Sequence, residues 1–180
     1  MKHMIIPDTQ VKPGSKMEHL KWAGQYAVEK KPDVIIHIGD HWDMPSLSSW
    51  DVGKKSFEGR RYNDDIEAGI AGMREFMKPI WKEQERLRRN KDKTWKPRLV
   101  FCLGNHEQRI ERAIEDDAKL EGLLSYDDFE LEQMGWEVHG FLDVVVIDGI
   151  AYSHYFTSGI MGRPVSSAKL MLSKKHMSCV

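Results

Sequence analysis

The chain has little cysteine, no long hydrophobic run and almost no net charge, and each shortage excludes a class of protein. Cys102 and Cys179 are the two cysteines among 180 residues, so a disulfide framework is not what holds the chain together. Without a secretory leader at the N-terminus, these isolated cysteines predict reduced thiols in a cytoplasmic protein. No apolar stretch approaches the roughly 20 residues of a membrane-spanning helix, so no membrane partner is expected.

The charges nearly cancel, with 27 Lys and Arg against 28 Asp and Glu, for a net charge of -1. This balance disfavours a general nucleic-acid or membrane-surface binder, which usually carries excess positive charge, although it leaves a locally basic groove open. Hydrophobic residues make up 41% and charged residues 31% of the chain, a globular mixture. The length favours one domain over residues 1–180 that buries its own core.

Short apolar runs alternate with helical patterns, which predicts the α/β class. The expected strands are residues 4–6, 33–38, 98–103, 136–139 and 142–151, the last with a turn at Asp148-Gly149. The expected helices are residues 15–31, a long one that includes residues 66–80, and 106–119. Pro79 is expected to kink or divide the long helix. Residues 44–62 predict an irregular loop, and the basic residues 82–96 predict a solvated helix end and loop, or a surface for nucleic acid.

Polar side chains follow four of the expected strands. They are Asp8, Gln10, Asp40, Asp43, Asn105, His106 and His154. Ligands of open α/β sheets bind beyond the carboxyl ends of the strands, so side chains far apart in sequence are expected to meet there. Carboxylate, amide oxygen and imidazole together suit a divalent ion such as Mn²⁺, Fe²⁺ or Zn²⁺. The glycines before Asp40 and Asn105 favour a sharp exit from each strand and a close approach of a ligand to the backbone.

Four segments in this order resemble the calcineurin-like metallophosphoesterases, especially their small phage-type members. The segments are Pro7-Asp8-Thr9-Gln10, Gly39-Asp40-His41-Trp42-Asp43, Gly104-Asn105-His106-Glu107 and Ser153-His154-Tyr155. The resemblance runs from about residue 4 to the end of the chain. It implies a layered α/β/β/α sandwich and a hydrolase of phosphate esters.

The resemblance also implies a role for each residue in a site with two divalent ions, most readily Mn²⁺, with Mg²⁺, Fe²⁺ or Zn²⁺ as alternatives. Asp8 and Gln10 would hold the first ion, Asp40 would bridge both, and Asn105 and His154 would hold the second. A water activated by the two ions would attack the phosphorus in line.

Two further residues complete the implied mechanism. His106 would bind no metal and would instead protonate the leaving oxygen, which is worth on the order of 10²–10⁴-fold in rate. Asp43 would hydrogen-bond His106 and orient it.

The sequence departs from the family pattern at two places. Gln10 stands where the family usually has His, and the family's closing Gly-His-x-His segment is missing before Val180. We therefore expect the C-terminal strands to be incomplete, with His176 a candidate substitute ligand. The alternative hypotheses are a catalytically impaired metal- or phosphate-binding remnant that lacks the last two ligands, and a site completed by a partner chain.

The substrate is less well defined by the sequence. Arg109, His41 and Arg163 are candidate substrate-binding residues, each with a surface position as the alternative. Trp42 and Trp50 flank the site loop and would either stack on a base or anchor the core and the loop. The sequence leaves open a monoester, a diester, a nucleotide or a nucleic acid as substrate, and it leaves open the oligomeric state.

Overall fold

A parallel four-stranded sheet forms the centre of the computed structural model, which describes residues 1–175 and 178–179. The strands are β1 (His3–Ile6), β2 (Val34–His37), β3 (Arg98–Cys102) and β4 (Glu137–His139). They lie in the order β1-β2-β3-β4, and every neighbouring pair is parallel. Parallel neighbours need crossover connections, which the intervening helices provide. The predicted α/β class is confirmed.

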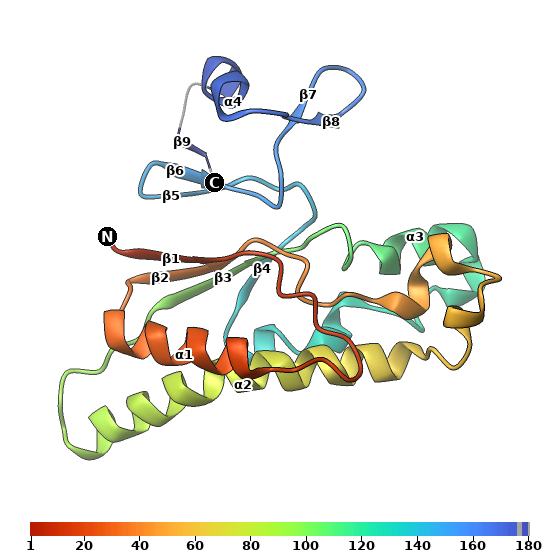
Figure 1. The fold of residues 1–180 in the computed structure, drawn as a ribbon. Helices are drawn as coiled ribbons and strands as arrows, with labels where there is room; N and C mark the ends of the chain where they lie inside the picture. Colours follow the sequence, from red (N-terminus) through yellow and green to blue (C-terminus); the bar gives the residue numbers. More distant parts are fainter. Residues whose placement is uncertain (176–177, 180) are drawn as a thin grey trace.

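Two long helices cover one face of this sheet, α1 (Glu18–Lys30) and α2 (Tyr62–Arg89), as Figure 1 shows below the strands. Their apolar stripes bury Leu20 and Ala27 from α1 and Met73 and Ile80 from α2 in the main core. Apolar residues that recur at helical spacing form one face, so the packing follows directly from the sequence pattern.

Of the two outcomes predicted for Pro79, division of the long helix is wrong, because α2 continues through it to Arg89, whereas a kink stays a prediction. Pro79 lies in the contact between the two helices, where a Cβ built on Gly24 of α1 would come 3.2 Å from the proline ring. Its neighbours Met77 and Ile80 are buried. Burial of these side chains against α1 offsets the backbone hydrogen bond that proline removes.

A second, smaller sheet packs on the other face of the parallel sheet. Its strands are β5 (Val145–Ile147), β6 (Ile150–Tyr152) and β9 (Ser178–Cys179), in the order β5-β6-β9. The turn between β5 and β6 falls at Asp148-Gly149 as predicted, with positive φ at both residues. The two sheets bury a separate apolar cluster of Val34, Ile36, Val100, Cys102, Val145, Ile147 and Tyr152. Helices, parallel sheet and second sheet therefore form three layers (Figure 1).

The remaining elements lie around these layers. They are α3 (Arg109–Asp116), α4 (Ala168–Lys175), β7 (Thr157–Ser158), β8 (Arg163–Pro164), and the 3₁₀ turns η1 (Pro45–Leu47), η2 (Ser49–Asp51), η3 (Lys55–Phe57), η4 (Ala118–Leu120), η5 (Tyr126–Phe129) and η6 (Glu132–Met134). Residues 44–61 thus form a loop with three 3₁₀ turns, and residue 62 already begins α2. Within the described ranges, no helix is at once long and apolar enough to cross a bilayer.

Candidate metal centre

The carboxyl ends of β1, β2 and β3 bring Asp8, Asp40 and Asn105 to one edge of the parallel sheet. The chain after β1 is tied to the chain after β2 by the backbone N–H of Gln10, which donates to the carbonyl oxygen of Asp40 at 2.9 Å. The backbone N–H of His106 donates to Oδ1 of Asp40 at 2.9 Å, which ties the chain after β3 to the same carboxylate. Three strand ends therefore share one network of hydrogen bonds.

Gly39 and Gly104 allow the second and third strand ends to approach each other closely. Gly39 has a φ of 97°, and a Cβ built on it would lie 2.6 Å from the backbone nitrogen of Gly104. A Cβ on Gly104 would lie 2.1 Å from Oδ1 of Asp40. The sharp exit from the strands is as predicted. We expected these glycines to let a ligand approach the backbone closely. In the structure they instead let the segment after β2 and the segment after β3 approach each other.

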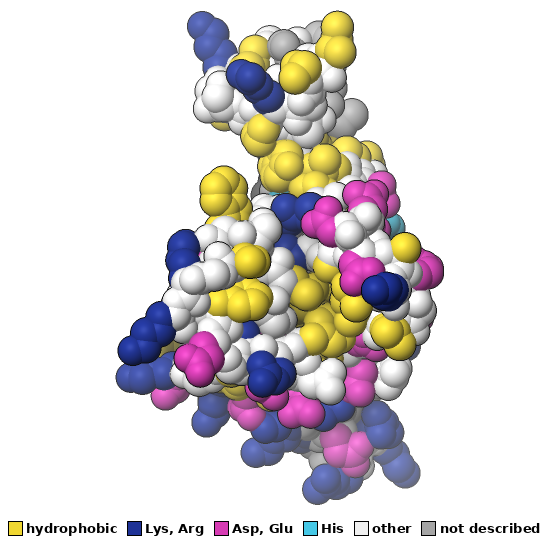
Figure 2. Space-filling model, turned by 90° about the vertical axis from the view of Figure 1, so that its right-hand side faces the viewer, with side chains coloured by type: hydrophobic (Ala, Val, Ile, Leu, Met, Phe, Trp, Pro, Cys, Tyr) yellow, Lys and Arg dark blue, Asp and Glu magenta, His cyan; other side chains and the backbone are white. Residues whose placement is uncertain are grey.

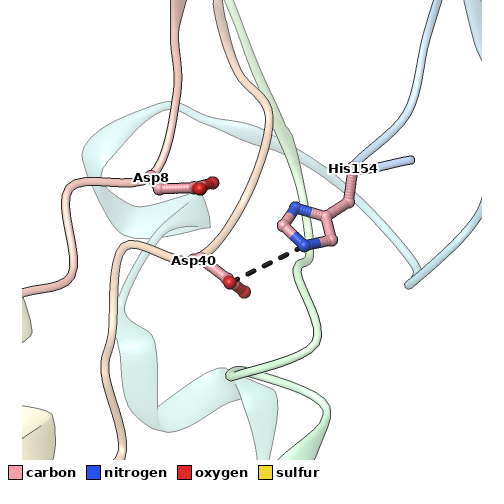
Figure 3. A group of neighbouring side chains, drawn as sticks. All are labelled: Asp8, Asp40 and His154. Atoms are coloured by element: carbon pink, nitrogen blue, oxygen red, sulfur yellow. Dashed lines mark ion pairs between the residues drawn. The ribbon is translucent and has the colours of Figure 1, made fainter. Parts of the chain in front are cut away.

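Asp8, Asp40 and His154 form the group that can hold a cation (Figure 3). One potential ligand atom from each lies within 4.8 Å of the others. Nε2 of His154 lies 3.6 Å from Oδ2 of Asp40 and 2.9 Å from Oδ1 of Asn105. Asp40 is buried, whereas Asp8 is exposed, so the group lies where the protein interior meets the surface. Four of the predicted ligands thus meet, and we call them the cluster: Asp8, Asp40, Asn105 and His154.

The orientation of His154 fits a ligand role. Its Nδ1 lies 2.7 Å from the carbonyl oxygen of Ile38, and since a carbonyl only accepts, Nδ1 carries the proton. In the neutral ring, Nε2 then presents a lone pair toward the oxygens of Asp40 and Asn105. A cation among these groups would be within reach of Nε2 and of both oxygens. The donor set, carboxylate and amide oxygens with one imidazole, suits a divalent ion of the Mn²⁺ type.

His106 and Asp43 form a hydrogen-bonded pair beside this group. Nδ1 of His106 lies 3.0 Å from Oδ1 and 2.9 Å from the backbone oxygen of Asp43, so the contact expected from the resemblance is present. Nε2 of His106 lies 3.8 Å from Oδ2 of Asp40. The hydrogen bond to His106, together with that from Lys12 at 2.9 Å, lowers the pKa of Asp43 to about 2 despite partial burial. The same bond to Asp43 raises the pKa of His106.

Glu107 has a structural role that the sequence reasoning missed. Its Oε1 accepts from the backbone N–H groups of His41 at 2.7 Å and Trp42 at 2.9 Å, and its Oε2 accepts from those of Asp40 at 2.9 Å and Gly104 at 2.8 Å. The side chain is fully buried, and burial raises its pKa. Glu107 thereby fixes the loop that carries Asp40. The available signal was a carboxylate directly after His106 in the turn from strand to helix.

Arg109 lies next to the His106–Asp43 pair. Its Nη1 donates to the backbone oxygens of Asp43 at 2.7 Å and Met44 at 3.1 Å, and its Nη2 lies 3.5 Å from Nε2 of His106. The side chain is half-buried, and burial lowers its pKa, although a guanidinium remains charged at any physiological pH. A positive charge therefore sits beside the His106–Asp43 pair, and the phosphate contact stays a prediction.

The other predicted substrate contacts lie elsewhere. His41 is fully buried, with Nε2 2.9 Å from the carbonyl oxygen of Gly69 and Nδ1 2.6 Å from the hydroxyl of Thr9. Burial lowers its pKa to about 4, so it is a neutral internal group and the expected substrate contact does not fit. Arg163 lies exposed in the β7–β8 hairpin, and no contact among the described residues joins it to the cluster. His176, the candidate substitute ligand, lies outside the described residues.

The two loop tryptophans differ in environment. Trp42 is fully buried and stacks on Phe129 with ring centroids 4.2 Å apart, so it anchors the core. Trp50 is 83% exposed. Trp50 is therefore the member of this pair that is able to meet a ligand.

The comparisons with known proteins relate the chain to phage proteins without assigning an activity. The Gene 54 protein of Mycobacterium phage L5 is 35% identical over 77 residues, which cover 43% of this chain and 29% of that protein. The Gene 54 protein of Mycobacterium phage D29 is 27% identical over 138 residues, 70% of this chain and 48% of that protein. The chain spans less than half the length of these curated relatives. No family model matches it, and no solved structure does.

Proposed function

We propose that the protein is a metal-dependent hydrolase of phosphate esters with a metallophosphoesterase-like sandwich fold. The observation that carries the proposal is the meeting of Asp8, Asp40, Asn105 and His154 at the carboxyl edge of the parallel sheet. Gln10, whose backbone is bonded to Asp40, is assigned as a further ligand. The layer order of helices, parallel sheet and second sheet supports the sandwich assignment.

The proposed ligands would hold two divalent ions, most readily Mn²⁺. Such ions, when bound, lower the pKa of a water molecule and neutralise the charge of a phosphate ester. Asp40 offers the central carboxylate, because it lies within reach of His154 and is bonded to the backbone of His106. The amide of Asn105 and the imidazole of His154 add no negative charge, which leaves the site able to accept an anion.

The chain's own residues supply the proton chemistry. His106 faces the cluster through Nε2, while Asp43 holds its Nδ1, so a protonated His106 is positioned to give a proton to a leaving oxygen. Asp43 stays ionised and favours the charged imidazole. Arg109 fixes the backbone of Asp43 and Met44 and adds positive charge beside the reacting phosphate.

The proposal is tested with purified protein, Mn²⁺ and two chromogenic esters, p-nitrophenyl phosphate and bis(p-nitrophenyl) phosphate. We expect release of p-nitrophenolate from at least one of them. Asp40→Asn and His106→Ala are each expected to lower kcat by about 100-fold or more, in the range of general acid–base catalysis. His19→Ala, which changes an exposed histidine of α1, serves as the control and is expected to keep full activity.

Equal activity of the wild type, Asp40→Asn and His106→Ala contradicts the proposal. Calorimetric titration with Mn²⁺ distinguishes an active enzyme from the alternative, a metal-binding remnant that has lost its activity. Binding that depends on Asp40 without any turnover identifies the catalytically impaired remnant, because the ligand geometry is then present without its chemistry.

A further inference from the structure

A cavity of about 350 Å³ lies directly beside the candidate metal centre, between the loop of residues 44–61 and helix α3. The residues of its lining that bear on a ligand are Trp50, Val52, Phe57, Asn105, Arg109 and Arg112. Asn105 belongs both to this lining and to the cluster, where its Oδ1 lies 2.9 Å from Nε2 of His154. A ligand that reaches the cluster therefore has this cavity as its neighbour.

One wall of the cavity is apolar and exposed. Trp50 is 83% and Val52 67% exposed, and Phe57 stands beside them in the lining. Figure 2, which views the molecule from the side where the strands end, shows hydrophobic side chains next to Lys and Arg side chains around a hollow on this face. Exposed apolar side chains that gather at a concave surface are typical of a binding site.

The opposite wall carries two guanidinium groups. Arg112 donates through Nη2 to the backbone oxygen of Asn105 at 2.5 Å, and Arg109 donates to the backbone of Asp43. Both arginines therefore lie at the end of the cavity that meets the cluster. Asp116 is the carboxylate of the lining, so positive charge prevails. Guanidinium groups bind phosphate oxygens through paired N–H donors.

The loop that carries Trp50 is held in place by charged contacts. Arg60 donates to Oδ2 of Asp51 at 2.8 Å and to the carbonyl oxygen of Pro45 at 2.9 Å. The backbone N–H of Ser46 donates to Oδ2 of the buried Asp65 at 2.8 Å. An exposed tryptophan on an anchored loop presents its ring with little ordering cost on binding.

We propose that this cavity is a nucleobase subsite and that the substrate class of the protein is a nucleotide. The base stacks on Trp50, while the phosphate lies at the arginine end of the cavity, next to Asn105. The inference rests on the proposed function for the chemistry of the phosphate, whereas the base recognition rests on the cavity itself. Aromatic side chains stack on any base, so the subsite accepts different bases.

The test is a calorimetric comparison of two probes without divalent ions, adenosine 5′-monophosphate and ribose 5-phosphate, which share the phosphate and sugar and differ in the base. We expect the nucleotide to bind the full chain about 10-fold more tightly, since stacking on one aromatic ring contributes on that order. Trp50→Ala is expected to remove the preference and Trp50→Phe to retain most of it. Trp22→Ala, which changes a 65% exposed tryptophan of α1, is the matched control and keeps the preference.

Equal affinity for both probes, or a preference that survives Trp50→Ala, overturns the proposal. Because the measurement needs neither metal nor turnover, its failure is distinct from a failure of the p-nitrophenyl ester assay. A 5′-phosphorylated single-stranded oligonucleotide identifies the source of the nucleotide. Binding at least 10-fold tighter than the mononucleotide, and weakened by Trp50→Ala, indicates a strand; equal binding indicates a free nucleotide.

Discussion

At the scale of single residues, the most informative side chain is that of Glu107, which takes no part in the proposed hydrolysis. Glu107 accepts four backbone N–H bonds and so holds the turn after β2 against the turn after β3. Asp40 has a φ of 53°, a left-handed conformation that is costly for a residue with a Cβ. Glu107 accepts its N–H and stabilises that conformation. The position of the central candidate ligand therefore depends on a buried carboxylate beneath it.

Glu107→Gln is expected to lower the free energy of unfolding by about 2–4 kcal/mol. An amide replaces one acceptor oxygen with a donor, so two buried backbone N–H groups lose their partner and face another N–H. Urea denaturation measures the loss. Glu115→Gln, at an exposed position of α3, is the control and should change stability by less than about 0.5 kcal/mol. A Glu107 variant as stable as this control would contradict the structural role.

At the scale of elements, the contact between α1 and α2 depends on the absence of a side chain. A Cβ built on Gly24 would lie 2.2 Å from the backbone oxygen of Phe76 and 3.2 Å from the ring of Pro79. Glycine thus lets the two helices pack closely against each other. The close packing also explains why Pro79 lies inside a continuous helix, since its ring fills the space beside Gly24.

Gly24→Ala is expected to destabilise the protein by about 1–3 kcal/mol, although alanine favours a helix more than glycine does. The clash is with backbone, which does not move aside without separating the helices. The neighbouring Gln25→Ala, on the exposed side of α1, is expected to leave stability unchanged or slightly higher. Thermal unfolding of both variants measures the difference, and equal midpoints would show that the helices pack less tightly than the structure indicates.

At the scale of the whole molecule, the candidate metal ligands come from two sheets. Asp8, Asp40 and Asn105 follow strands of the parallel sheet, whereas His154 follows β6 of the second sheet. His3 of β1 also reaches Tyr152 of β6, with Nδ1 2.6 Å from the hydroxyl. A cation held by all four ligands would therefore connect the two sheets and stabilise the folded state.

We expect Mn²⁺ at 100 times its Kd to add about 2.7 kcal/mol to the free energy of unfolding. For a chain of this length, that gain raises Tm by roughly 5–10 °C. His154→Ala removes the ligand from the second sheet and is expected to lose most of the rise. His139→Ala, at a histidine paired with Glu137, is the control and should keep it. Equal rises for wild type and His154→Ala in differential scanning calorimetry would contradict the shared site.

The sequence by itself determined the α/β class, the strands of the parallel sheet and the residues that follow them, because local hydrophobic periodicity and turn residues specify these features. Tertiary structure decided which of those residues meet. It brings Asp8, Asp40, Asn105 and His154 together but buries His41, because the packing of α2 covers that ring with the backbone of Gly69. Contacts between segments far apart in the chain depend on how the layers pack, and no local sequence pattern specifies that packing.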